Sequence, residues 1–357
     1  MPPVRVLVVD DSSVIRKVLT HALASNPDIE VAGTAPSGPI ALAKIPQLNP
    51  DVVTLDVEMP GLNGIQTLAE IRKVYPKLPV IMFSSLTERG ASATLEALAM
   101  GASDYVTKPS AENLDRAREL IRKELVTKIL FFARRRIAAT PASAVKATPK
   151  PRLGGQRIDV LAIGSSTGGP NALLDLLPRL PADLPVPVVL VQHMPPLFTR
   201  FLAERLDSRS PLCVREAERG AALKPGQVWV APGDYHMTVE RKPSSVVLSL
   251  NQGPPENSCR PAVDVLFRSV ATAYGANVLA VVLTGMGYDG ARGAQAIREA
   301  GGEIFVQDES SSVVWGMPGA VVAAGAADKI CPLSAIASEI AGRIALGQAS
   351  QSRAAAP

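Results

Sequence analysis

The stretch "IDVLAIGSSTGGPNALLDLLPRL" at residues 158–180 joins an apolar run to a segment with helical periodicity through a turn rich in glycine and serine. A phosphate-binding P-loop would end in Gly-Lys-Ser/Thr, and the dinucleotide pattern G-x-G-x-x-G needs a different glycine spacing, so neither fits. The sequence "GSSTG" at 164–168 does fit G-x-S-x-G, in which small neighbours let a central serine project from a strand-to-helix turn. Ser166 is therefore the candidate nucleophile.

Further strand candidates follow this turn and alternate with helical patterns. They are "VPVVLVQH" at 186–193, "QVWVAPG" at 227–233, "NVLAVVLTG" at 277–285 and "EIFVQD" at 303–308, with a predicted hairpin at 237–250. Such alternation favours helices packed on both faces of a parallel sheet. We therefore predict a doubly wound, mainly parallel α/β serine-hydrolase domain over residues 157–348.

A nucleophilic serine needs a base, and the chain contains three histidines. His21 lies on the polar side of a predicted helix, and His236 lies at the edge of the predicted hairpin. His193 ends the strand at 186–193 and precedes Met-Pro-Pro. Because the carboxyl ends of parallel strands meet at one edge of a sheet, His193 is the candidate that lies nearest Ser166.

The base in turn needs a carboxylate to orient it. Asp289 lies in the glycine-rich stretch "TGMGYDG" that follows the strand at 277–285, and we prefer it to Asp264 in a predicted helix and Asp234 in a turn. The chain order is then Ser, His, Asp. Enzymes of the α/β-hydrolase type use the order Ser, Asp or Glu, His, so the domain is predicted not to be of that type.

The first 123 residues also alternate strands and helices, with five strand candidates at 4–10, 29–33, 51–56, 79–85 and 104–107. Acidic or polar side chains end or follow these strands: Asp10, Asp11, Asp56, Ser84 and Lys108. If the first and third strands are neighbours, the three carboxylates converge and favour a hard cation such as Mg²⁺. Metal, hydroxyl and ammonium together predict a pocket that accepts a phosphoryl group.

The two α/β segments are separated by a predicted helix extension and flexible linker at 124–156, and the C-terminal residues 349–357 are predicted to be a disordered tail. Six basic residues and no acid occur within 133–152, so most of the net charge of +4 lies in the linker. The N-terminus lacks the features of a signal peptide, and no apolar run is long enough to span a bilayer. Three widely spaced cysteines are typical of free thiols, so a cytoplasmic location without membrane insertion is expected.

The motifs "LVVDDS", "LDVEMPGLNG", "FSS" and "DYVTKP" resemble the response-regulator receiver domain over about residues 4–121. The resemblance implies a flavodoxin-like fold and phosphorylation of Asp56 by a partner histidine kinase. It also implies Mg²⁺ bound by Asp10, Asp11, Asp56 and the backbone carbonyl of Glu58. Ser84 and Tyr105 occupy the positions that relay the phosphorylated state.

The motifs "GSSTGGP", "QHMPP", "APGDYHM", "RPAVDVLF" and "LTGMGYDGA" are similar to the catalytic domain of chemotaxis protein-glutamate methylesterases, over about 157–345. The likeness implies a phosphorylation-activated serine esterase that hydrolyses glutamate γ-methyl esters on chemoreceptor helices, releases methanol and also deamidates receptor glutamines. No cofactor is implied for the esterase step. The implied site residues are the triad Ser166, His193 and Asp289, with the backbone N–H groups of Thr167 and Met286 as oxyanion donors.

Two other output functions compete with an esterase. A DNA-binding output requires basic residues on a recognition helix, whereas the second half is rich in strand signals and the basic run lies in the linker, so no nucleic-acid partner is expected. A phospho-regulated, non-catalytic receptor-binding regulator would keep the receiver and differ only in lacking activity. Substitution of the triad separates that alternative from an enzyme.

Overall fold

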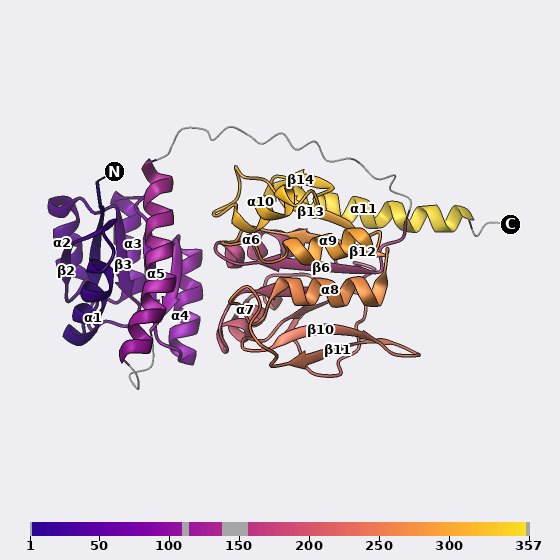
Figure 1. Ribbon diagram of the computed structural model, residues 1–357, viewed down its shortest axis with the longest axis horizontal. Coiled ribbons are helices and arrows are strands. Elements are labelled where there is room, and N and C mark those ends of the chain that lie inside the picture. The colour runs from indigo at the N-terminus through magenta and orange to yellow at the C-terminus, as the bar shows by residue number, and fades with distance from the viewer. Residues whose placement is uncertain (1, 109–113, 138–155, 355–357) are drawn as a thin grey trace. The chain divides into compact units, whose positions relative to one another are not determined.

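The computed structural model describes residues 2–108, 114–137 and 156–354 (Figure 1). The chain divides into two compact units, Met1–Ala144 and Val145–Pro357. Nearly all of the predicted linker at 124–156 beyond residue 137 lies outside the described residues. Each unit is described here by itself.

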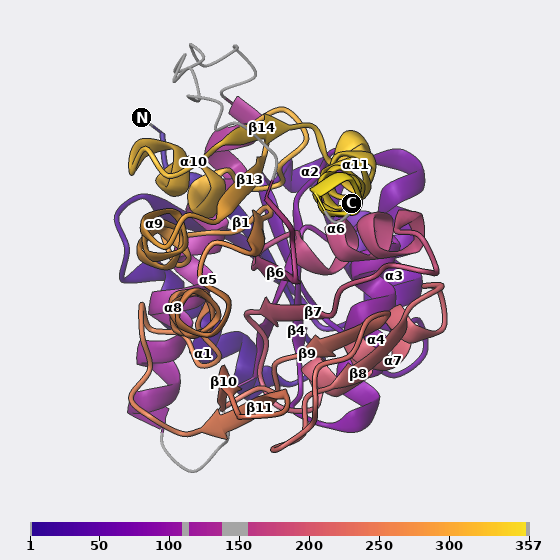
Figure 2. The ribbon, with the colours of Figure 1, turned by 90° about the vertical axis from the view of Figure 1, so that its right-hand side faces the viewer.

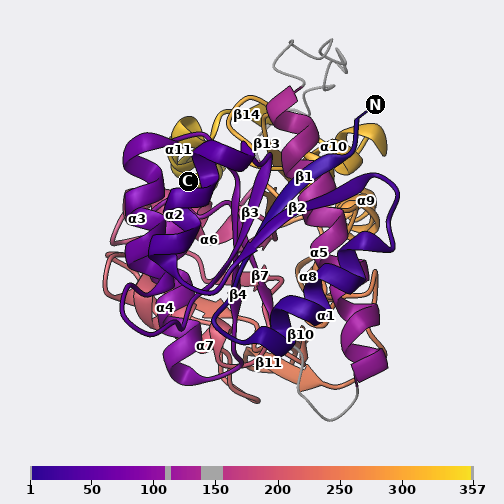
Figure 3. The ribbon, with the colours of Figure 1, turned by 90° about the vertical axis from the view of Figure 1, so that its left-hand side faces the viewer.

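The first unit is a five-stranded parallel sheet in the order β2-β1-β3-β4-β5, which is the flavodoxin-like arrangement predicted from the sequence. Its strands are β1 (Val4–Val9), β2 (Ile29–Ala35), β3 (Val52–Asp56), β4 (Val80–Ser84) and β5 (Asp104–Thr107). Its helices are α1 (Ser13–Ala24), α2 (Gly38–Leu48), α3 (Gly64–Val74), α4 (Glu88–Ala99) and α5 (Leu114–Ile137). Figure 3 shows α1 and α5 on one face of the sheet and α2, α3 and α4 on the other.

Strands β1 and β3 are neighbours, as the carboxylate cluster requires. They pair in parallel from Val6 opposite Val52 to Val9 opposite Leu55. The residues that follow this register, Asp10 and Asp56, therefore lie at the same edge of the sheet. Every residue of β3 and β4 is buried because helices cover both faces.

The second unit is a seven-stranded parallel sheet in the order β14-β13-β12-β6-β7-β9-β8, with a separate antiparallel hairpin. The sheet strands are β6 (Val160–Ser165), β7 (Val188–Gln192), β8 (Cys213–Glu216), β9 (Gln227–Val230), β12 (Val278–Val282), β13 (Glu303–Gln307) and β14 (Lys329–Cys331). The hairpin is formed by β10 (His236–Arg241) and β11 (Val246–Asn251). The hairpin and five of these sheet strands are where the sequence predicts them.

Helices flank the seven-stranded sheet on both sides (Figure 2). The helices α8 (Val263–Tyr274), α9 (Ala291–Glu299) and α10 (Gly316–Ala323) lie on one side. The helices α6 (Gly169–Leu176), α7 (Phe198–Asp207) and α11 (Leu333–Ala354) lie on the other, and a short 3₁₀ turn, Leu177–Arg179, follows α6. Val160, Leu161, Ala162 and Ile163 of β6 are fully buried, which is why the strand reads as a continuous apolar run.

Two features differ from the sequence-based expectation. The strands β8 and β14 were not predicted, because they are short edge strands and β8 has only Val214 buried. Helix α11 continues to Ala354, into the segment predicted to be a disordered tail. Helix α5 is continuous to Ile137, in agreement with the helix extension predicted after residue 123.

The glycines of the turn after β6 are required by its geometry. Gly168 has φ +79°, which disfavours any residue with a Cβ. A Cβ on Gly169 would lie 2.0 Å from Oε1 of Gln192, and one on Gly164 would lie 2.4 Å from Cγ1 of Val263. The close approach at Gly164 brings the first residue of α8 against β6.

We predict that Gly164→Ala lowers the free energy of unfolding of the second unit by about 1–3 kcal/mol, because the added methyl must displace Val263. The control is Gly342→Ala in α11, where nothing lies within 4 Å of the added Cβ. Alanine at that helical position should raise stability by about 0.5–1 kcal/mol. Thermal unfolding of both variants measures this, and equal midpoints would contradict the packing argument.

Candidate active site

Ser166 lies directly after β6, between the ends of β7 and β12. Its backbone N–H donates to the Thr284 carbonyl at 3.1 Å. A Cβ on Gly285 would lie 2.9 Å from the Cβ of Ser166, so the loop after β12 runs immediately beside this serine. Ser166 is half-buried.

Ser165 is held differently from its neighbour. It is fully buried, and its hydroxyl donates to Oε1 of Gln192 at 2.8 Å. The Gln192 amide in turn donates to the carbonyl of Ser166 at 3.0 Å and to that of His193 at 3.2 Å. Ser165 therefore has a structural bond inside the turn, and Ser166 is the serine at the accessible edge.

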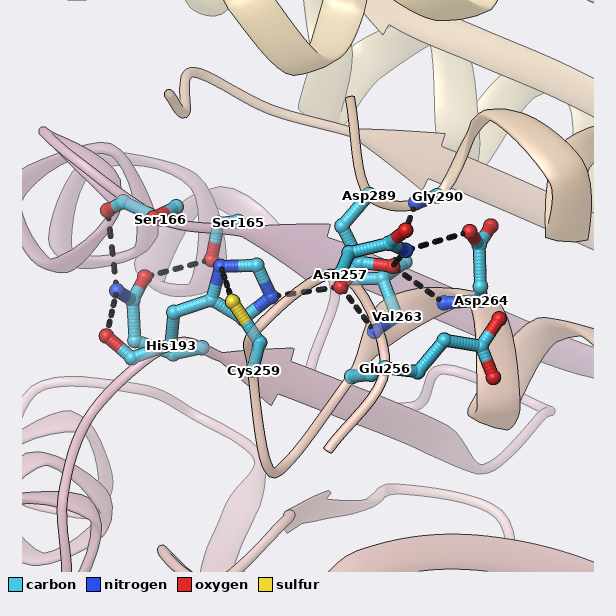
Figure 4. A network of polar contacts seen from close by, with 12 residues as sticks. Ser165, Ser166, His193, Glu256, Asn257, Cys259, Val263, Asp264, Asp289 and Gly290 are labelled. Atoms are coloured by element: carbon cyan, nitrogen blue, oxygen red, sulfur yellow. Dashed lines mark hydrogen bonds and ion pairs between the residues drawn. The ribbon is translucent and has the colours of Figure 1, made fainter. Parts of the chain in front are cut away.

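His193 follows β7 and lies beside the serine turn, since its backbone N–H donates to the Ser165 carbonyl at 3.1 Å. Its Nε2 is 2.7 Å from Oδ2 of Asp289, and its Nδ1 is 3.5 Å from Sγ of Cys259. Figure 4 shows the imidazole between the two serines on one side and Asp289 on the other. With Nε2 on the carboxylate, Nδ1 is the nitrogen available to a serine hydroxyl.

Asp289 accepts five hydrogen bonds. Oδ2 receives His193 and the N–H of Val263 at 2.7 Å. Oδ1 receives the Asn257 amide at 2.8 Å and the N–H groups of Asp264 and Gly290, each at 3.0 Å. Val263 and Asp264 begin α8, which has no side-chain cap of its own, so Asp289 satisfies unpaired N–H groups at that helix terminus.

The two rival carboxylates, Asp264 and Asp234, have hydrogen-bond partners other than His193. Asp264 is fully buried and receives the N–H of Gly293 at 2.6 Å, which places it at the start of α9. Asp234 pairs with Arg260 at 2.5 Å. Of these three carboxylates, only Asp289 hydrogen-bonds His193 in the described part of the chain.

Asp289 and His193 each stabilise the charged form of the other. Burial alone would raise the pKa of Asp289, but the hydrogen bond and charge of His193 and the backbone N–H groups lower it. Burial alone would lower the pKa of His193, whereas the contact with Cys259 and the hydrogen bond and charge of Asp289 raise it.

The two predicted oxyanion donors flank the serine. Thr167 is the next residue in the turn, and Met286 follows Gly285, which packs against the Ser166 side chain. The Thr284 hydroxyl donates to the Thr167 carbonyl at 2.9 Å and so ties the two loops together. Both backbone N–H groups therefore belong to segments fixed beside Ser166.

The first unit holds a second polar cluster at the edge of its sheet. Ligand oxygens of Asp10, Asp11 and Asp56 lie within 4.8 Å of one another. The Lys108 ammonium is 3.1 Å from Oδ2 of Asp10 and 2.8 Å from Oδ2 of Asp56. Burial raises the pKa of Asp56 to about 6 and that of Asp10 as well, with Lys108 opposing both shifts. Clustered carboxylate oxygens that carry this desolvation cost fit a hard divalent cation such as Mg²⁺.

The other predicted residues of this pocket are placed less directly. The Ser84 hydroxyl is buried and donates to the Gly90 carbonyl of α4 at 3.1 Å, so it is bonded to α4 and not to the carboxylates. Tyr105 is buried in β5, and burial raises its pKa well above the usual value. Glu58 donates its backbone N–H to Oδ1 of Asp56 at 3.1 Å, and metal binding by its carbonyl stays a prediction.

Three residues of the network were not identified from the sequence: Gln192, Asn257 and Cys259. Gln192 is the last residue of β7 and precedes His193. A polar side chain at the carboxyl end of a parallel strand is a candidate site residue, so this position could have identified it. Asn257 and Cys259 lie in the loop "ENSC", whose sequence gives no sign that it reaches the triad. All three cysteines are free thiols, as predicted.

Comparison with known proteins places the chain among two-unit regulators. A Trichodesmium erythraeum protein named "Protein-glutamate methylesterase/protein-glutamine glutaminase" is 52% identical over 351 residues, covering 96% of this chain and 100% of the relative. A Nocardioides sp. protein of the same name is 52% identical over 356 residues, covering 97% and 96%. The crystal structure of the Thermotoga maritima CheB methylesterase catalytic domain is 43% identical with a TM-score of 0.51, covering 52% of this chain and 98% of that one.

Two family descriptions match the two units: "Response regulator receiver domain" over residues 6–121 and "CheB methylesterase" over residues 161–340. Fold and site together define a response regulator whose output unit is an α/β hydrolytic enzyme. The chain belongs to the CheB methylesterase family. Among the described helices, none is long and apolar enough to cross a membrane.

We predict that Asp289→Asn lowers kcat by about 10⁴-fold, because an amide NH₂ facing Nε2 favours the wrong tautomer of His193. Asp234→Asn is the matched control, since Asp234 pairs with Arg260 and not with His193. It should retain activity. Methanol release from methylated receptor fragments measures both, and similar losses in the two variants would reject Asp289 as the orienting carboxylate.

Proposed function

We propose that this protein is a phosphorylation-activated serine esterase that removes methyl groups from glutamate γ-methyl esters on the cytoplasmic helices of chemoreceptors. The observation that carries the proposal is the position of Ser166 at the end of β6, beside the hydrogen-bonded pair of His193 and Asp289. The printed names of its relatives give the substrate class. These substrates and the kinase partner assign the reaction to the cytoplasm.

The first chemical step uses the tautomer set by Asp289. When Nε2–H is donated to Asp289, the lone pair of Nδ1 is free to accept the Ser166 proton. The serine oxygen then attacks the ester carbonyl, and Asp289 stabilises the imidazolium that forms. This requires the Nδ1 contact to pass from Cys259 to the Ser166 hydroxyl.

The tetrahedral oxyanion needs fixed donors, and the backbone N–H groups of Thr167 and Met286 fill that role in the proposal. His193 returns its proton to the methoxy oxygen, methanol leaves, and Ser166 carries an acyl group. Water, deprotonated by His193, then releases glutamate. With a glutamine side chain the leaving group is ammonia, which is the deamidation that the relatives' names include.

The receiver unit supplies the regulation. A histidine kinase transfers a phosphoryl group to Asp56, and Lys108 at 2.8 Å pairs with the added charge. Mg²⁺ held by Asp10, Asp11 and Asp56 with the Glu58 carbonyl would neutralise phosphoryl charge during transfer. Ser84 leaves its bond to Gly90 to reach the phosphoryl group and, with Tyr105, relays the change.

A non-catalytic receptor-binding regulator is the competing function. It would keep the receiver chemistry and bind the same receptor helices without turnover. The buried, fully hydrogen-bonded Asp289 on His193 favours the enzyme, because a binding surface needs no such pair. Turnover that depends on Ser166 distinguishes the two.

We expect Ser166→Ala to abolish methanol release from methylated receptor cytoplasmic fragments, a loss of about 10⁴–10⁶-fold. Ser165→Ala is the matched control, because the Ser165 hydroxyl is bonded to Gln192 and not to the triad. It should cost far less. Equal losses would refute the choice of nucleophile, and undiminished release from Ser166→Ala would refute the serine mechanism.

Asp56→Asn should leave basal methanol release in place and remove its stimulation by a small phosphoryl donor such as acetyl phosphate with Mg²⁺. The amide cannot accept the phosphoryl group, although it keeps the size of the side chain. Release is compared with and without the donor in wild type and variant. Stimulation that persists in Asp56→Asn would show that another group is the acceptor.

A further inference from the structure

The loop of residues 256–259 has a strained backbone beside the triad. Glu256 and Cys259 exchange both backbone hydrogen bonds, at 3.1 and 2.8 Å. The two central residues, Asn257 and Ser258, have φ +53° and +64°, which is the pattern of a type I′ turn. The left-handed backbone conformation costs conformational free energy at a residue that has a Cβ, such as Ser258. Such strain persists where surrounding contacts hold the backbone in place.

The turn aims the Asn257 side chain at two buried carboxylates. Its amide nitrogen donates at 2.8 Å to Oδ2 of Asp264 and at 2.8 Å to Oδ1 of Asp289. An amide NH₂ has two hydrogens, so both are used. Figure 4 shows Asn257 between the two acids.

These two acids form an electrostatically costly pair. Asp264 is 0% exposed and Asp289 is 2% exposed. Like charges this close favour protonation of one partner, and the negative charge of Asp289 raises the pKa of Asp264 in addition to burial. If Asp289 were the protonated partner, it could not hold Nε2–H of His193.

We propose that Asn257 is the positioning residue that keeps Asp289 ionised and directed at His193, by donating one amide hydrogen to each of the two buried carboxylates. A neutral donor satisfies both acids without adding charge. It fixes Oδ1 of Asp289, so that Oδ2 faces Nε2 of His193. Asn257 acts on the serine only through this chain of contacts, and the inference rests on the proposed esterase function.

The other charged or titratable groups around the pair are accounted for. His193 faces Asp289, and Cys259 faces the other nitrogen of His193. Glu256 is neutralised by a bidentate pair with Arg268, at 2.7 and 2.6 Å. Among the described residues, no lysine or arginine hydrogen-bonds Asp264 or Asp289, so the amide of Asn257 takes the place that a cation would otherwise fill.

The test uses two substitutions in the full-length protein. Asn257→Gly suits the left-handed backbone and removes both donors without strain. Asn257→Asp keeps the shape and replaces the donor with a third carboxylate. The matched control is Asn277→Asp, which removes a 2.8 Å amide bond to Asp159 at the other end of β12.

Two readouts are compared. The first is methanol release over a range of pH, with Ser166→Ala as the inactive reference. The second is NMR titration of the His193 imidazole, which needs no substrate and is assigned with His193→Gln. Thermal unfolding shows that each variant is folded.

For Asn257→Asp we expect the acid limb of kcat/KM and the NMR pKa of His193 to fall together by about one unit or more, because a third carboxylate without the amide donors favours protonation of Asp289, which removes the charge that stabilises the imidazolium. Asn257→Gly should lower kcat at least about tenfold with KM unchanged, because in the proposal residue 257 acts through Asp289 and His193 and not on substrate binding. Asn277→Asp should match wild type in both readouts.

The positioning role is wrong if the Asn257→Asp profile and His193 titration superpose on those of wild type, whatever happens to thermal stability. It is also wrong if Asn257→Gly changes KM alone. Failure of the esterase function has a different signature. Wild type would then release no more methanol than Ser166→Ala, while the His193 titration would still report on Asn257.

Discussion

The site of the second unit depends on one carboxylate, that of Asp289. It satisfies the N–H groups of Val263 and Asp264 at the start of α8 and binds Nε2 of His193 with the same oxygen that receives Val263. A helix N-terminus favours negative charge, so the fold stabilises the ionised form that the imidazole needs. Asp264 repeats the arrangement one helix further on, by receiving Gly293 at the start of α9. The two acids therefore join helix capping to chemistry, and Asn257 lies between them.

Parallel strands explain why the residues of the proposed triad can come from three distant parts of the chain. β6, β7 and β12 are adjacent and run in one direction, so the residues after each strand meet at a single edge. Backbone hydrogen bonds from His193 to Ser165 and from Ser166 to Thr284 fix the positions of the three strand ends relative to one another. The glycines at 164, 168 and 169 let the serine turn fit among Val263, Val313 and Gln192. Packing therefore sets the distances between the side chains that take part in the proposed reaction.

The receiver unit also gathers its charged residues at the carboxyl edge of a parallel sheet, but the electrostatics of that site are different. Its carboxylates receive fewer backbone N–H groups than Asp289 does. The ammonium group of Lys108 offsets the charges of Asp10 and Asp56. Burial still raises the pKa of Asp56 to about 6, so the cluster remains under-neutralised. Added Mg²⁺ or a change in charge on Asp56 therefore alters the balance strongly, which suits a switch. The carboxylate of Asp289, by contrast, is stabilised in its ionised state.

The strand-and-helix alternation, the glycine-dependent turn and the sheet-edge positions could all be predicted from the sequence, because each is local or follows from strand polarity. The side chains placed at sheet edges in this way are Asp10, Asp56, Ser166 and His193. The sequence favoured Asp289 over Asp264 and Asp234 because of its glycine-rich loop, but it could not show the hydrogen bonds of Asp289 to His193 and to the start of α8. Nor could it find Asn257 or Cys259, whose loop lies 64 to 66 residues from His193 in the chain and has no motif of its own. Those choices were made only by the tertiary structure. Hydrogen bonding between buried groups depends on where α8, α9 and the 256–259 turn pack, and packing is a property of the whole unit.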